Sequence, residues 1–332
     1  MTASDGGICD AKHVDRKNPV YLFETAKSQN RALYVCAPMV RYSKLPFRLL
    51  VQEYGVDISY TPMMLAHEFI RHPVARDSDF TTNDDEGPVI AQFASSDPQE
   101  FSRAACLISP WVNGVDLNCG CPQSWAIREG IGCSLMSKPA LVRDIVAAAK
   151  SVLGPDKSVS IKIRIHKDIQ TTINFLNTVL EAEPDFVTVH ARTRSQRSST
   201  PPDLEALKIL KSHFPDLPMI ANGDVFTRED AEHIMVKTGV QGAMSARGIL
   251  ENPCLFAGYD TTPIEAVRKI MSYSTACGLR YELAQYHVHE MLTKALTKRE
   301  RKQLMECKDM IELTDWLEEK ANMQRGDLSQ DR

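Results

Sequence analysis

Short runs rich in β-branched and apolar residues alternate with amphipathic stretches along most of this chain. The runs number eight and cover residues 33–38, 57–61, 88–93, 114–118, 158–165, 186–190, 218–222 and 241–246. Between them, apolar residues recur at helical spacing in 98–108, 139–152, 171–181, 204–213 and 228–237. Strands that alternate with helices pair in parallel through crossover helices, and eight such units within roughly 250 residues match a closed (β/α)8 barrel. We therefore expect a TIM barrel, with its active site at the C-terminal ends of the strands.

The alternative for such a pattern is an open, doubly wound parallel sheet. That fold usually carries a glycine-rich nucleotide loop after its first strand. Neither G-x-G-x-x-G nor G-x-x-x-x-G-K-[ST] occurs in the sequence, which favours the closed barrel.

The strand pattern ends at Asn252-Pro253, and 262–320 is a run of helical stretches with Gly278 as its obvious break. We predict a disordered N-terminus at 1–18, the barrel at 19–258, a helical domain at 259–320 and a disordered tail at 321–332. Residues 261–302 hold eight Lys or Arg against four acids, and 303–332 reverse that ratio. The net charge of −4 argues against coating of nucleic acid by charge alone, and the basic segment could equally be a solvated helix face.

Composition restricts where the chain can reside. No stretch approaches the roughly 18 apolar residues of a membrane span, and the first 30 residues resemble neither a secretory signal nor a transit peptide. Nine scattered cysteines suit reduced thiols rather than a disulfide framework. We expect no membrane association and a cytoplasmic location, with the nucleus as a second expectation.

Polar residues follow the ends of the predicted strands. Asn222, Gly223 and Asp224 follow the seventh strand, and Ala246 and Arg247 follow the eighth. In barrels, the loops after these two strands commonly form a phosphate cradle from backbone N–H groups, and glycine and arginine suit that role. The simpler alternative is that the glycines only turn the chain and that Arg247 pairs with an acid.

The fifth strand alternates strictly, so Lys162 and Arg164 share a face with Ser158 and Ser160. If that face is the barrel interior, the lysine needs an anion or an electron-rich ring as its partner. An outward face paired with helix carboxylates is the alternative. His190, at the end of the sixth strand, could likewise be a core histidine.

The turn Cys119-Gly120-Cys121-Pro122 closes the fourth strand. Its one-residue spacing does not match structural zinc and no second pair follows, so we predict no metal site. Cys121 could be a nucleophile, which needs a neighbouring base, or an acid, which needs only a thiol that stays protonated. A buried thiol without chemistry is the third alternative.

Several motifs together resemble one enzyme family. Asp116-x-Asn118-x-Gly120-Cys121-Pro122, followed by Gly130-x-Gly132 and Lys138-Pro139, resembles the signature of the tRNA-dihydrouridine synthases. Segments in that family's order and spacing continue from residue 33 to about 257: Ala37-Pro38-Met39, Ala91-Gln92-Phe93, Ile161-Lys162-Ile163-Arg164, Val189-His190-x-Arg192-Thr193, Ile220-Ala221-Asn222-Gly223-Asp224 and Ala246-Arg247-Gly248. Residues 36–44, 75–83 and 256–259 are most similar to the eukaryotic type-four branch, for which positions 20a and 20b are the expected targets.

The resemblance implies a flavin enzyme that reduces uridine to 5,6-dihydrouridine in the D-loop of tRNA. It implies a hydride from FMN to C6, a proton from Cys121 to C5, and NADPH or NADH as the reductant. Asn118 is expected to orient the uracil. The cofactor contacts that the resemblance implies are Pro38, Met39, Val40, Gln92, Lys162, His190, Asn222, Gly223, Asp224, Ala246 and Arg247.

The substrate of that family has a consequence for the C-terminal helices. A uridine in folded tRNA must flip out to reach such a pocket, so the basic segment is expected to hold the tRNA backbone. We expect tRNA as a partner, and no obligate protein partner is evident from the sequence.

Two residues depart from the family pattern, because Ala191 and Ala246 stand where glycine is usual. Neither change removes a reactive group. The competing interpretations are a flavin barrel that acts on a free metabolite such as a pyrimidine, and a non-catalytic RNA-binding protein. The presence of Cys121, Lys162 and Arg247 disfavours the second of these.

Overall fold

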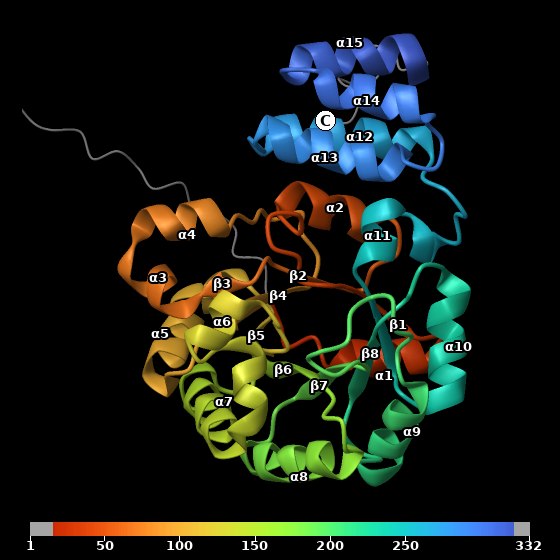
Figure 1. The fold of residues 1–332 in the computed structure, drawn as a ribbon. Coiled ribbons are helices and arrows are strands. Elements are labelled where there is room, and N and C mark those ends of the chain that lie inside the picture. Colours follow the sequence, from red (N-terminus) through yellow and green to blue (C-terminus); the bar gives the residue numbers. More distant parts are fainter. Residues whose placement is uncertain (1–15, 322–332) are drawn as a thin grey trace, which may run out of the picture.

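Residues 16–321, the part of the chain that this computed structural model describes, contain a closed barrel of eight parallel strands (Figure 1). Hydrogen-bonded neighbours follow the order β2-β1-β9-β8-β7-β6-β5-β4, and a β2–β4 pairing closes the ring. A short additional strand, β3 (Met64–Leu65), pairs with the end of β4. The barrel strands are β1 (Leu33–Cys36), β2 (Ile58–Tyr60), β4 (Val89–Ala94), β5 (Gly114–Cys119), β6 (Ser158–Arg164), β7 (Phe186–His190), β8 (Met219–Asn222) and β9 (Gly242–Ser245).

Helices surround the barrel (Figure 1). Capping residues in the sequence determine where several of them begin. Asp97 caps α5 by accepting from the backbone N–H groups of Gln99 and Glu100. Thr227 and Asp230 form a capping box at the start of α10. The helices around the barrel are α2 (Leu45–Glu53), α3 (Ala66–Arg71), α4 (Pro73–Asp79), α5 (Pro98–Ile108), α6 (Ser124–Arg128), α7 (Pro139–Leu153), α8 (Ile169–Val179), α9 (Leu204–His213), α10 (Arg228–Thr238) and α11 (Arg247–Glu251).

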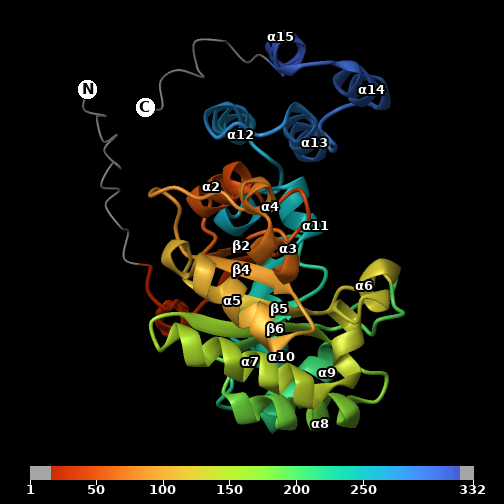
Figure 2. The same cartoon turned by 90° about the vertical axis from the view of Figure 1, so that its left-hand side faces the viewer.

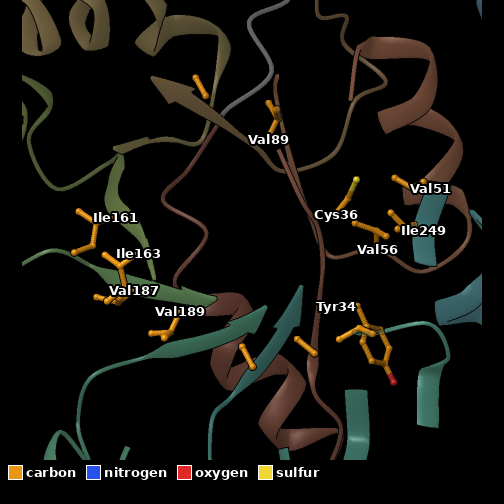
Figure 3. Packing of buried hydrophobic residues seen from close by; sticks show 14 of the residues in the cluster. Tyr34, Cys36, Val51, Val56, Val89, Ile161, Ile163, Val187, Val189 and Ile249 are labelled. Atoms are coloured by element: carbon orange, nitrogen blue, oxygen red, sulfur yellow. The ribbon is translucent and has the colours of Figure 1, made fainter. Parts of the chain in front are cut away.

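The hydrophobic core has an outer and an inner layer. Outward-facing strand residues such as Ile161 and Val187 pack beneath the helices (Figure 3). A smaller inner layer fills the N-terminal half of the barrel and includes Leu33 and Ile220. Helix α1 (Tyr21–Ser28) closes that end, where the ring of Phe23 lies 5.5 Å from the ring of Phe186. Because mainly apolar residues fill this end, the charged side chains of the interior lie toward the opposite, C-terminal mouth.

Four helices after the barrel stand to one side of it (Figures 1 and 2). They are α12 (Ile264–Ala276), α13 (Tyr281–Leu292), α14 (Lys298–Glu306) and α15 (Met310–Ala321). Helix α12 packs on α2, and α13 packs on α11. The rings of Tyr42 and Tyr286 stack at 4.2 Å, and the buried ring of His287 stacks on Phe47 at 4.7 Å. These contacts attach the helical domain to the β1 and β2 side of the barrel.

The barrel predicted from the sequence is confirmed, with all eight strands in place. The five predicted helices lie within two residues of α5, α7, α8, α9 and α10. The alternation pattern did not identify α1, α2, β3 or the short helices α3, α4 and α6. No helix within residues 16–321 has the length and hydrophobicity that crossing a bilayer requires.

The predicted disordered ends fall mostly outside the described residues, which exclude 1–15 and 322–332. Residues 16–18 differ from that expectation. The Arg16 guanidinium donates to the Asn83 carbonyl at 2.7 Å, and the Asn18 amide donates to the Pro155 carbonyl at 3.2 Å. The boundary between barrel and helical domain at 258/259 stays a prediction.

Candidate active site

A chain of hydrogen bonds links polar side chains inside the barrel mouth. Asp116 accepts from Ser160 Oγ at 2.7 Å and from Gln92 Nε2 at 2.9 Å. Gln92 Oε1 in turn accepts from Asn118 Nδ2 at 2.8 Å. All four side chains are buried. The parallel register places Gln92 beside Asp116 and Asp116 beside Ser160, so this chain follows directly from strand pairing.

Asn118 also holds the loop that carries Cys121. Its Oδ1 accepts from the backbone N–H groups of Gly120 at 3.1 Å and Cys121 at 2.9 Å. On the other side of the loop, the Cys133 N–H donates to the Cys121 carbonyl at 2.9 Å. Gly132 approaches so closely that an added Cβ would lie 2.7 Å from that carbonyl oxygen. The half-buried Cys121 thiol is therefore fixed by its backbone and remains accessible.

Lys162 points into the barrel, as the inward alternative predicts. Its side chain is 9% exposed, and Nζ donates to Asn222 Oδ1 at 2.7 Å. Burial, reinforced by the neighbouring Arg164 charge, lowers the pKa of Lys162 to about 8. Burial raises the pKa of Asp116 to about 6, against the opposing effect of its hydrogen bonds to Ser160 and Gln92. The mouth thus presents a poorly solvated amine, which an anionic or electron-rich ligand would stabilise in its charged form.

A second part of the site lies across the mouth, at the ends of β7, β8 and β9. A cavity of about 70 Å³ there is bounded by side chains and backbone from these three strand ends. It brings together six of the predicted residues, namely His190, Asn222, Gly223, Asp224, Ala246 and Arg247.

Charged groups around this cavity are closely paired. Asp224 forms ion pairs with the buried Arg192 and with Arg247, whose Nη2 lies 2.6 Å from Asp224 Oδ1. Arg247 is therefore both a lining residue of the cavity and the partner of an acid. Burial and the charges of Lys162, Arg164 and Arg192 hold the pKa of His190 well below its usual range. The imidazole of His190 is consequently neutral, with Nε2 3.3 Å from Arg192 Nη1.

The backbone at this cavity suits a phosphate group. Gly223 has a φ of +138°, and a Cβ added to Gly248 would lie 2.2 Å from the Val225 carbonyl oxygen, so both positions require glycine. The Asp224 carboxylate would repel a phosphate, but its two arginine partners neutralise it. The cradle therefore fits a phosphate through backbone groups and through the half-exposed Arg247 side chain, and not through the Asp224 carboxylate.

The three predicted cofactor residues in the loop after β1 do not all lie at the same site. Pro38 and Met39 are partly buried at the mouth, and Ser43 Oγ donates to the Met39 carbonyl and accepts from its N–H at 3.0 Å. Val40 is 53% exposed and lines a different cavity, of about 470 Å³, between the barrel and α13. Within residues 16–321, no group of three or more His, Cys, Asp or Glu side chains is arranged to hold a metal.

A family model described as dihydrouridine synthase matches residues 35–329. The chain belongs to the dihydrouridine synthase family. It is 44% identical over 311 residues to the tRNA-dihydrouridine(20a/20b) synthase of Schizosaccharomyces pombe, covering 94% of each chain. It is 39% identical over 311 residues to the human tRNA-dihydrouridine(20a/20b) synthase-like protein, covering 93% of this chain and 95% of the human one. The names of both relatives specify NAD(P)+.

Solved structures support the barrel. A complex of 2-naphthoyl-CoA reductase with 2-naphthoyl-CoA superimposes with a TM-score of 0.52 at 10% identity, over 68% of this chain and 49% of that one. At this identity the likeness shows the fold that this dihydrouridine synthase family member shares with it, and nothing of its site.

Sequence reasoning about this dihydrouridine synthase family member missed several supporting residues. Asp116 and Arg192 stood within the quoted motifs but were assigned no role, and the structure shows Asp116 holding Gln92 and Arg192 holding Asp224. Arg164 donates through Nε to the Gly120 carbonyl at 3.0 Å, next to Cys121. Two signals could have identified these residues. One is the strict alternation of the fifth strand, and the other is the register between neighbouring strands.

Proposed function

We propose that this chain reduces uridine to 5,6-dihydrouridine in the D-loop of tRNA, at positions 20a and 20b. The observation that carries this proposal is the arrangement across the barrel mouth, where the Cys121 loop faces a phosphate-sized cradle with buried Lys162 between them. Membership of the dihydrouridine synthase family and the names of the relatives support the substrate and the positions.

The cradle at β7, β8 and β9 would bind the phosphate of FMN, with Pro38 and Met39 next to it at the end of β1, the strand that pairs with β9. FMN bound there, once reduced by NADPH or NADH, would supply the hydride for C6 of the uracil. His190 is neutral and so donates or accepts single hydrogen bonds there without adding charge. Asn222 holds Lys162 Nζ in the interior, where the ammonium would stabilise negative charge at the polar edge of the cofactor.

Cys121 would donate the proton that C5 of the uracil receives. A thiol in its protonated form can act as a general acid. Within residues 16–321, the hydrogen bonds that hold its loop are made by the backbone groups of Gly120 and Cys121, and the Cys121 side chain itself is half-buried. We assign two roles to Asn118, because its Oδ1 positions the Cys121 loop and the second N–H of Nδ2 is available to the uracil.

The helical domain would hold the tRNA while the uridine enters the mouth. The cavity of about 470 Å³ between barrel and α13 is lined by Arg41, Lys44 and Arg280, together with Asp79 and Glu282. Exposed cations continue along the start of α14 at Lys298 and Arg299. A flipped uridine and its flanking backbone could pass along this route, because phosphates need cations and not sequence-specific contacts.

Replacing Cys121 by Ala tests the assignment. We expect the variant to keep bound flavin and its reduction by NADPH, and to lose dihydrouridine formation by about 100-fold to 10,000-fold, the usual contribution of a general acid. Dihydrouridine would be measured in tRNA by mass spectrometry after a single turnover. Cys106→Ala, which removes an exposed thiol on α5, is the matched control and should leave turnover unchanged. Unaltered turnover in Cys121→Ala would rule out the acid assignment.

A further inference from the structure

A third cavity, at the rim of the barrel, has no part in the chemistry described so far. Its volume is about 500 Å³, within the usual range of small-molecule sites. The ends of β6 and β7 and the segment after the Cys121 loop enclose it. Its walls include Met136, Arg164, Ile165, Lys167, Thr193 and Arg194.

The cavity adjoins the proposed reaction centre through Arg164. The Arg164 Nε donates to the Gly120 carbonyl at 3.0 Å, and Nη1 donates to the Thr193 carbonyl at 2.8 Å. Cys133, another wall residue, donates from Sγ to the same Gly120 carbonyl at 3.0 Å. A ligand in this cavity therefore lies against the residues that hold the Cys121 loop.

The walls carry positive charge without a matching acid. Arg164, Lys167 and Arg194 line the cavity, and no carboxylate does. Lys167 and Arg194 are exposed and form no ion pair with any described residue. The nearest acid in sequence, Asp168, caps α8 and accepts there from the Gln170 N–H. This arrangement is suited to a phosphate, whereas the apolar patches of Met136 and Ile165 suit a flat ring.

The position of the cavity separates it from the proposed tRNA route. Strands β6 and β7 lie on the side of the barrel away from α12 to α15 (Figures 1 and 2). The reductant must place its nicotinamide at the same mouth as the uridine, so its adenosine end has to leave the mouth over the rim. Sites that hold an unmodified ribose 2′-hydroxyl usually present an acid, whereas a 2′-phosphate is accommodated by arginine.

We propose that this cavity binds the 2′-phosphoadenosine end of NADPH, through Lys167 and Arg194. The proposal rests on the proposed function, because it takes NADPH to be the reductant. Arg164 would link the bound reductant to the Cys121 loop, and the enzyme would prefer NADPH to NADH.

Binding of adenine nucleotides to the flavin-loaded protein tests this without turnover. In isothermal titration calorimetry, 2′,5′-ADP should bind at least about tenfold more tightly than 5′-AMP, the change expected for one charge-assisted hydrogen bond. Arg194→Gln and Lys167→Gln should each weaken 2′,5′-ADP by about tenfold and leave 5′-AMP nearly unchanged. Arg197→Gln, on the same loop but outside the cavity walls, is the matched control and should bind as the wild type does.

Three results would overturn the proposal. These are equal binding of the two nucleotides, full binding of 2′,5′-ADP by both variants, or a loss of tRNA affinity in the variants with nucleotide binding intact, which would assign the cavity to tRNA. The proposed function is tested separately, by dihydrouridine formation after chemical reduction of the flavin with dithionite. That step needs no NADPH, so the two ideas can fail independently.

Discussion

Asn118 connects two parts of the site through one carboxamide. Its oxygen receives the Gly120 and Cys121 N–H groups, and its nitrogen donates to Gln92, which is itself held by Asp116. A buried network of this kind favours a single geometry. Any other arrangement would leave a buried polar group without a hydrogen-bond partner, at the full free-energy cost of its desolvation. The position of the Cys121 thiol is thus determined by side chains that never touch it.

Lys162 gives a pH-dependent prediction at the same scale. Its pKa in the folded chain is about 8, against an ordinary value of 10.5. Between these values the unfolded chain binds a proton that the folded chain has released, so through this group the free energy of unfolding rises with pH from about 8 to about 10.5. The free energy of unfolding of the flavin-free protein, measured with guanidinium, should therefore rise by about 2 kcal/mol from pH 7.5 to 9.5 through this group. This rise should be absent in Lys162→Met. The same pH dependence in both proteins would contradict the burial argument.

Residue types at the strand ends could be predicted, but their partners could not. The sequence indicated that His190, Asn222, Gly223, Asp224, Ala246 and Arg247 belong together, and they line one cavity. Residue identity alone could not show that Asp224 would pair with two arginines, nor that Val40 would face the helical domain. These outcomes depend on χ angles and on loop paths that strand periodicity does not specify.

The position of the Cys121 loop depends on a neighbouring secondary-structure element as well as on single side chains. The loop after β5 is enclosed by the 3-10 turn Gly132–Ser137, which brings Gly132 against the Cys121 backbone. Regular alternation predicted the strands and five of the helices around the barrel, because a parallel barrel repeats one unit eight times. It could not predict α1 or β3, because these elements interrupt the repeat and are held by tertiary contacts with the barrel.

Gly132→Ala tests the enclosure of the loop. Gly132 has a φ of +61°, and the new Cβ would lie 2.7 Å from the Cys121 carbonyl oxygen and 3.0 Å from its Cβ. We expect a loss of about 3 kcal/mol in the free energy of unfolding from strain and overlap together, and a large fall in dihydrouridine formation.

Gly239→Ala is the matched control for that variant. Gly239 ends α10 at a φ of +79°, and its added Cβ would meet only the Lys211 side chain at 3.6 Å. It should lose about 1 kcal/mol and keep its activity. Equal effects of the two substitutions, measured by thermal unfolding and single-turnover assay, would contradict a specific contact at Cys121.

At the scale of the whole molecule, a barrel with one polar mouth is joined to a helical domain on one side (Figure 1). The net charge of −4 argued against a general affinity for nucleic acid, and the local charge of 261–302 was the signal for a binding face. The structure shows why that signal was ambiguous. Lys269 and Lys294 pair with acids of the barrel side, Glu53 and Glu251, whereas Lys298 and Arg299 are exposed at the start of α14.

The double variant Lys298→Gln, Arg299→Gln should weaken tRNA binding uniformly across tRNA species. Because each phosphate contact releases counterions, the slope of log affinity against log salt should fall by about 1 to 2. Filter binding over a salt series would measure this, with flavin content as a check on folding. Lys208→Gln with Lys237→Gln, exposed on α9 and α10, is the matched control. An unchanged slope in the α14 variant would show that α14 does not contact the tRNA backbone.

The most direct test of the central claim is the visible spectrum of the purified protein, followed anaerobically through reduction by NADPH and then addition of tRNA that lacks dihydrouridine. We predict a flavin band that NADPH bleaches and that returns rapidly only with this tRNA. A tRNA with cytidine at positions 20a and 20b should not restore the band. A bleached band that is indifferent to tRNA, or no flavin band at all, would contradict the account.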